Sequence, residues 1–72
     1  MLYEITIEHI TPCGGEKHAI REIIEAEAES PMAYVLANKR FPDVSILKSN
    51  KEETVIEVRN NAGYKTRYTF TE

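Results

Sequence analysis

The segment "TPCGGEKH", residues 11–18, contains the residue types in this chain that are most capable of chemistry. It holds the only cysteine, Cys13, together with His18, and a second histidine, His9, lies two residues before the segment. A thiolate and two imidazoles are ligands that Zn²⁺ or Cu⁺ accepts in proteins. These three residues are therefore the candidate metal site. A Cys13 nucleophile with His18 as its base is the corresponding candidate for catalysis.

The same segment also has a structural interpretation, which we favour. Gly14 supplies the positive φ that a tight turn between two strands requires. A turn centred on Cys13 and Gly14 pairs Ile7 with Ile20, Tyr3 with Ile24, Ile5 with Glu22 and His9 with His18. One hairpin offers three ligands and the sequence shows no fourth, so this interpretation predicts neither a bound metal nor a cofactor.

Length and composition predict one small domain over residues 1–72. The chain has 72 residues, of which 42% are hydrophobic, and this is sufficient for a thin core. Such a core leaves little room for an enclosed active site, so we predict that the protein is not an enzyme. The sequence has no run of about 18 apolar residues, which predicts no membrane insertion. A lone cysteine fits a reducing compartment, and we expect a soluble cytoplasmic protein.

Charge is distributed unevenly along the sequence. Residues 1–30 carry seven Glu against Lys17 and Arg21, a net charge of −5, whereas residues 31–72 carry seven basic and five acidic residues, a net charge of +2. Nucleic-acid binding generally needs a basic surface, so the overall charge of −3 disfavours a nucleic-acid partner. The alternative is a local basic patch in the second half of the chain, formed by Lys39, Arg40, Lys48, Lys65 and Arg67.

Alternation of apolar and polar residues predicts strands near both ends of the sequence. Residues 2–10 alternate in this way, and so do residues 53–60 and 64–71, which the turn segment "NNAG" joins into a hairpin. Residues 43–50 form a shorter predicted strand ahead of that hairpin. Tyr64 alternates in step with Tyr68 and Phe70, so we predict that all three belong to the core.

The pattern predicts one helix at about residues 31–40. Ser30 is a suitable N-cap and Pro31 suits the first helical position, while Lys39 and Arg40 favour a helix C-terminus. The residues expected to face the sheet are Met32, Val35 and Leu36, with Phe41 just beyond the helix.

Residues 18–29 allow two interpretations. Their Ala and Glu content favours a helix, whereas the strict alternation from Ile24 to Glu29 favours a strand. The strand is the leading interpretation. The predicted fold is therefore α+β, a mainly antiparallel sheet with one helix packed on one face, in the order β-β-α-β-β-β. The alternative order is β-α-α-β-β-β.

In the leading fold, Glu25, Glu27 and Glu29 share the uncovered face of the second strand. Like charges on one side of a strand repel each other, and basic residues on a neighbouring strand, such as Lys65 and Arg67, would offset that repulsion. The functional interpretation is a surface for a basic protein partner. We therefore predict a non-catalytic protein that acts by protein–protein interaction, through this acidic face or an exposed edge strand, with a homodimer as one form of such an interaction.

Overall fold

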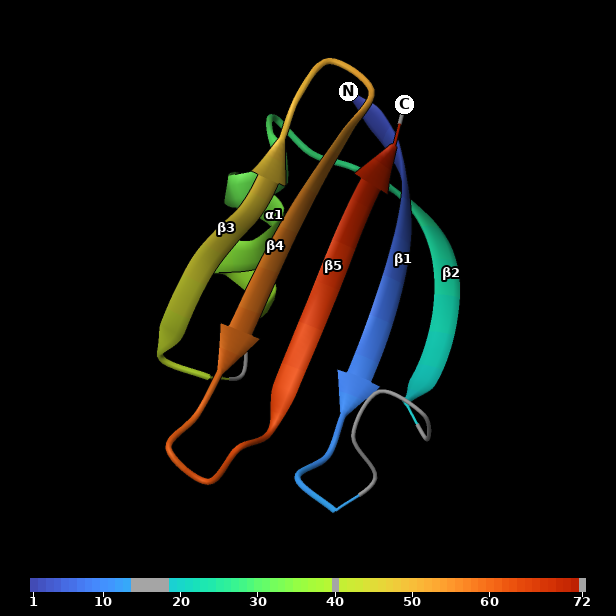
Figure 1. Ribbon diagram of the computed structural model, residues 1–72. Coiled ribbons are helices and arrows are strands. Elements are labelled where there is room, and N and C mark those ends of the chain that lie inside the picture. Colours follow the sequence, from blue (N-terminus) through green and yellow to red (C-terminus); the bar gives the residue numbers. More distant parts are fainter. Residues whose placement is uncertain (14–18, 40, 72) are drawn as a thin grey trace.

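The computed structural model describes residues 1–13, 19–39 and 41–71 of the chain. These ranges form strands and one helix in the predicted order β-β-α-β-β-β (Figure 1). The elements are β1 (Leu2–Ile10), β2 (Ile20–Glu27), α1 (Pro31–Asn38), β3 (Asp43–Ser49), β4 (Glu53–Arg59) and β5 (Lys65–Thr71). The α+β prediction is confirmed, and the ambiguous segment follows its alternating pattern and forms β2.

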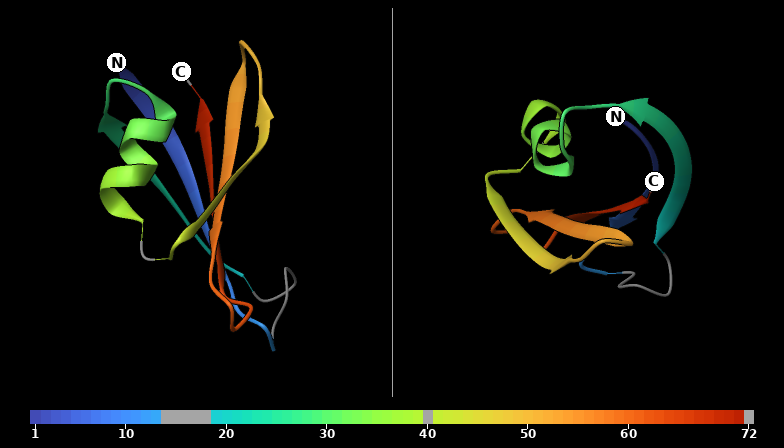
Figure 2. Two further views of the ribbon diagram at one scale, coloured as in Figure 1. Left: turned by 90° about the vertical axis from the view of Figure 1, so that its left-hand side faces the viewer. Right: turned by 90° about the horizontal axis from the view of Figure 1, so that it is seen from above.

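All neighbouring strands of the sheet are antiparallel, in the spatial order β2-β1-β5-β4-β3. The first and last strands of the sequence therefore lie side by side near the centre, whereas β2 and β3 form the two edges. The sheet is curled, and α1 lies on its concave side (Figure 2). The side of the sheet that α1 covers is termed the core face, and the opposite side the open face.

Alternate side chains of the strands build the core, as the sequence pattern requires. The largest fully buried side chains are Phe70, Ile5, Ile56, Val35 and Val58. Each contributes about 1.5–3 kcal/mol of stabilisation through removal of apolar surface from water. Ile24 and Ala26 of β2 pack against the same cluster while remaining partly exposed. The core face of β2 is therefore its even-numbered side, and its odd-numbered residues belong to the open face.

The helix begins where the sequence predicts and ends two residues earlier. Ser30 Oγ accepts a hydrogen bond from the Ala33 amide at 3.1 Å, which caps the first turn. Val35 is buried, but the prediction that Leu36 faces the sheet is wrong, because Leu36 is 54% exposed. Tyr34 takes that role instead, since its ring packs edge-on against Tyr68 and Phe70 with centroids 6.2 and 5.8 Å apart. These ring contacts set the rotation of the helix about its axis and leave Leu36 on its exposed side.

The pairing of β1 with β2 differs by two residues from the predicted register. Ile5 lies opposite Ile24, Ile7 opposite Glu22, and His9 opposite Ile20. A shift of two residues leaves every side chain on its original face, so the alternating pattern does not distinguish the two registers. The observed register places two apolar side chains, Ile5 and Ile24, directly opposite each other, where the predicted one opposed Ile5 to Glu22.

The β4–β5 hairpin has the predicted turn, but the aromatic residue that follows it is not part of the core. Gly63 adopts a φ of +92°, and the side chain of Asn60 accepts hydrogen bonds from the amides of Ala62 and Tyr64. Tyr64 precedes β5 and is exposed, so its predicted place in the core is wrong. The edge strand β3 carries a bulge, because its pairing with β4 shifts by one residue at Leu47.

Candidate protein-interaction surface

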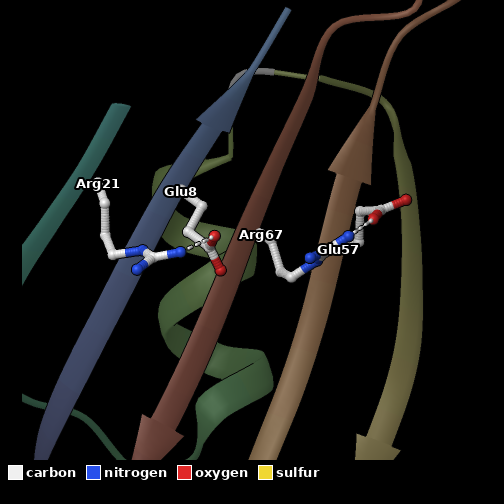
Figure 3. Close-up of polar contacts among 4 residues, drawn as sticks. All are labelled: Glu8, Arg21, Glu57 and Arg67. Carbon is white, nitrogen blue, oxygen red and sulfur yellow. Dashed lines mark hydrogen bonds and ion pairs between the residues drawn. The ribbon is translucent and has the colours of Figure 1, made fainter. Parts of the chain in front are cut away.

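The open face carries a row of charged residues that crosses four strands. The register aligns Arg21 of β2 with Glu8 of β1, Glu8 with Arg67 of β5, and Arg67 with Glu57 of β4. The sign of the charge alternates along this row, which is termed the charge row. Arg21 donates to Glu8 at 3.0 Å, and Arg67 donates to Glu57 at 3.4 Å (Figure 3). The charges on this part of the open face are therefore paired with opposite charges within the molecule.

Burial differs along the charge row and is greatest at Glu57. The Glu57 side chain is only 8% exposed although no helix covers the open face, and its partner Arg67 is 24% exposed. A carboxylate withdrawn from water in this way is stable only with a cation or donor nearby. Arg67 supplies both the charge and the hydrogen bond. Removing Arg67 would leave the Glu57 carboxylate as an uncompensated buried charge.

A second group of charged residues on the same face lacks this matching. Glu4 of β1 lies directly opposite Glu25 of β2, and Glu27 follows on the same side of β2. These three residues are exposed and are termed the acidic corner; Glu29, two residues beyond β2, is exposed as well. In the ranges that the structure describes, no residue forms an ion pair with any of the four. Like charges in direct opposition weaken strand pairing.

A shallow hollow of about 280 Å³ lies at the acidic corner. It is lined by Leu2, Tyr3, Glu4, Glu25 and Thr71. Leu2 is 61% exposed, so the hollow offers apolar surface beside two carboxylates. That combination suits a lysine or arginine side chain, which can lay its aliphatic stem on the apolar surface and bring its cation to the carboxylates.

The alternative that Lys65 and Arg67 offset the charge of the strip Glu25, Glu27 and Glu29 is contradicted by the strand order. Strand β1 lies between β5 and β2, so neither basic residue lies next to the strip. Lys65 lies opposite Ile10 and Arg59, and Arg67 pairs with Glu57. Sequence reasoning also missed Glu4 as a member of the acidic surface. The strand register would have identified Glu4, because Glu4 lies opposite Glu25 only in the observed pairing.

The register that would place His9 opposite His18 is not the one observed. His9 lies opposite Ile20 instead of His18, and its Nε2 is 3.5 Å from a carboxylate oxygen of Glu22. Cys13 is an exposed free thiol. His18, with Gly14 and Gly15, lies outside the described residues. Within the described ranges, no three His, Cys, Asp or Glu side chains are grouped so that they could hold a metal ion.

The basic residues proposed for nucleic-acid binding are dispersed, and two of them are engaged by carboxylates. Lys48 Nζ lies 2.6 Å from Glu53 Oε1, and this hydrogen bond raises the pKa of the Lys48 ammonium above its ordinary value. Arg67 is held by Glu57 in the charge row. Lys39 follows α1, and Arg40 lies outside the described residues. Lys65 lies on the same strand as Arg67, opposite Arg59.

Comparison with known proteins does not add to this picture: no protein-family model matches the chain, and neither curated proteins nor solved structures give a match. In the portion of the chain that the structure describes, no helix has the length and apolar character needed to cross a membrane.

Proposed function

We propose that this protein is a non-catalytic binding protein whose acidic corner receives a basic segment of a partner protein. The observation that carries the proposal is the direct opposition of Glu4 and Glu25 beside the hollow that they line with Leu2. Elsewhere on the same face each strongly buried charge has an opposite charge next to it. At the corner the protein retains a repulsive pair that a cation from outside would convert into an attractive one.

The energetics of strand pairing favour this interpretation. An opposed pair of like charges destabilises a sheet by an amount of the order of 0.2–1 kcal/mol. A lysine or arginine seated between Glu4 and Glu25 would remove that repulsion and gain two charge-assisted hydrogen bonds. The remaining negative charge of Glu27 and Glu29 would steer a basic segment towards the corner and increase its rate of association.

We place the protein in the cytoplasm. An exposed free thiol at Cys13 is compatible with a reducing compartment, where thiols stay unoxidised. A basic segment of another cytoplasmic protein is the partner that this chemistry fits.

A peptide-binding experiment with charge-matched variants tests the proposal. The probe is a fluorescent synthetic peptide with lysine or arginine at alternate positions, and binding is followed by anisotropy over a salt titration. The test variant is Glu4→Gln/Glu25→Gln, and the control is Asp43→Asn/Glu52→Gln, which changes the net charge equally at two exposed sites that do not line the hollow. We expect the test variant to bind at least about tenfold more weakly than the control, a difference of about 1.4 kcal/mol.

Two results would contradict the proposal. Equal weakening in both double variants would show that the peptide responds only to net charge. Unchanged binding by the Glu4→Gln/Glu25→Gln protein would show that the corner is not the binding surface.

A further inference from the structure

The edge strand β2 presents a defined set of backbone groups to solvent. Ala28 and Met1 exchange both backbone hydrogen bonds, at 2.9 and 3.0 Å, so they form a hydrogen-bonded pair at the end of the β1–β2 ladder. Such pairs alternate along an antiparallel ladder. The even-numbered residues of β2 therefore bond to β1, and the N–H and C=O groups of Arg21, Ile23, Glu25 and Glu27 point away from the sheet.

The two edges of the sheet differ in how they discourage further pairing. The β3 edge has a bulge at Leu47, a feature that disrupts a regular ladder. The β2 edge pairs with β1 without any register shift over its eight residues and contains no proline. Its side chains include the two most exposed large apolar residues described in the chain, Ile20 and Ile23, at 70% and 63%. A regular edge with exposed apolar residues is a template for another strand.

The sequence of β2 is complementary to itself in one antiparallel register. In a dimer with a two-fold axis, the new hydrogen bonds form between residues whose backbone N–H and C=O groups point away from the sheet. The pairing is therefore restricted to odd-numbered with odd-numbered positions. When Ile23 lies opposite Ile23 of the second copy, Arg21 lies opposite Glu25 of the second copy, and the symmetry repeats this charge pair. Directly opposed apolar residues and opposite charges both stabilise strand pairing.

The adjacent registers lose this match. A shift in one direction places Arg21 opposite Ile23 of the second copy. A shift in the other places Ile23 opposite Glu25 of the second copy. In both cases an isoleucine faces a charged residue. Arg21 remains available for a second carboxylate, because its side chain is 63% exposed while it holds Glu8, and a guanidinium has five N–H donors.

We propose that the protein forms a two-fold symmetric dimer in which the β2 strands pair antiparallel with Ile23 opposite Ile23 of the second copy. The two sheets become one continuous ten-stranded sheet, and their open faces lie on the same side. This inference goes beyond the proposed function, because the occupant of the β2 edge is a second copy of the chain; in the dimer, Arg21 of the second copy also supplies an opposite charge to Glu25 of the acidic corner.

Exchange of charges across the interface between the two β2 strands tests the register directly. The mass of the protein is measured by sedimentation velocity over concentrations up to about 1 mM, so that a dissociation constant in the millimolar range is detected. Arg21→Glu places a glutamate opposite Glu25 of the second copy, and Glu25→Arg places an arginine opposite Arg21 of the second copy. Each single variant therefore opposes like charges, and we expect it to weaken the dimer by about tenfold or more. The double variant Arg21→Glu/Glu25→Arg restores both pairs between the copies and should dimerise more tightly than either single variant; within each copy it exchanges the charges opposite Glu8 and Glu4.

Cysteine cross-linking supplies a readout that does not depend on affinity. In a Cys13→Ser background, Ile23→Cys should form a disulfide-linked dimer on mild oxidation, because hydrogen-bonded partners have Cα atoms about 5.5 Å apart. The matched control is Glu27→Cys in the same background. In the proposed register the two residues 27 are about 27 Å apart, so this variant should not cross-link.

A pair of edge substitutions decides which edge is used. Ile23→Lys and Ile46→Lys each place a lysine at an exposed isoleucine, one on β2 and one on β3. We expect the β2 variant to be monomeric and the β3 variant to dimerise normally. A monomeric wild type at every concentration, loss of the dimer only in Ile46→Lys, or failure of the double charge exchange to restore it would each overturn the proposal.

Discussion

On β1 and β2, the charge row and the acidic corner occupy the same face, four residues apart, and differ in the sign of the charge opposite the β1 glutamate. Glu8 of β1 has Arg21 opposite it, whereas Glu4 of β1 has Glu25 opposite it. In the row, charge is matched inside the molecule and contributes to the stability of the sheet. In the corner, the same backbone geometry leaves charge to be matched from outside. The comparison separates charges that maintain the fold from charges that are available for binding.

The largest effect is expected from removing a carboxylate of the charge row. Glu57→Ala should lower the free energy of unfolding by about 2–3 kcal/mol, less than the 3–5 kcal/mol of a fully buried pair because the Arg67 side chain is partly exposed. Urea denaturation measures the change. The same substitution in the corner, Glu25→Ala, should leave stability unchanged or raise it slightly. A loss at Glu57 no greater than that at Glu25 would remove the distinction between the two regions.

Converting the corner into a copy of the row should stabilise the protein. Glu25→Arg places an arginine opposite Glu4, as Arg21 lies opposite Glu8, and we expect a gain of about 0.5–1 kcal/mol in the free energy of unfolding. The measurement is made at dilute protein and low ionic strength, so that association does not contribute. If the variant were less stable than the wild type, Glu4 and Glu25 would not repel each other as the register indicates.

A smaller effect on stability, with a clear effect on binding, is expected when the acidic strip is neutralised. Changing Glu25, Glu27 and Glu29 to Gln should raise the free energy of unfolding by a few tenths of a kcal/mol, as for other weak surface charge effects. The same variant should lose affinity for basic peptides and associate with them more slowly. Melting temperature and peptide binding are measured on the same samples. A variant that melts lower yet binds normally would show that the strip has no binding role.

The smallest effect is expected at the ion pair of Lys48 with Glu53, which lies two strands away from the acidic corner. Glu53 lies across the sheet from Glu4 and is matched by Lys48, whose pKa is raised by this contact. A raised folded-state pKa stabilises the protein below the unfolded pKa of about 10.4, and the contribution is lost as pH rises through the folded pKa. The stability difference between wild type and Lys48→Met should therefore be constant near neutral pH and shrink above about pH 10.5. A difference independent of pH would exclude the ion pair as its source.

The sequence predicted which face of the sheet a side chain occupies better than it predicted which residues lie opposite each other on adjacent strands. Alternation assigned Ile5, Ile56 and Phe70 to one side of the sheet, because a period of two has only two phases. It could not place Glu4 opposite Glu25, since a slide of two residues preserves every face. Nor could it show that β1 lies between β2 and β5, because strand order depends on contacts between segments far apart in the chain.

The helix illustrates a further limit. Ser30 and Pro31 marked its start, because capping is a local interaction between neighbouring residues. Its rotation depends on the aromatic contacts of Tyr34 with Tyr68 and Phe70, which lie more than thirty residues away in the sequence. Leu36 was therefore assigned to the core by periodicity and is excluded from it by tertiary packing.

The central pairing of β1 with β5 has a consequence for the time course of folding. Glu4 meets Thr71 and Ile10 meets Lys65, so the contacts that join the two halves of the sheet span most of the chain. Rates fall as contacts become less local, and sheets of this kind fold in roughly milliseconds to seconds. During synthesis, the β1–β2 hairpin has no central partner until the last strand, β5, has been made. Its apolar face, with Ile5 and Ile7, stays uncovered for that interval, and the chain is then most vulnerable to aggregation.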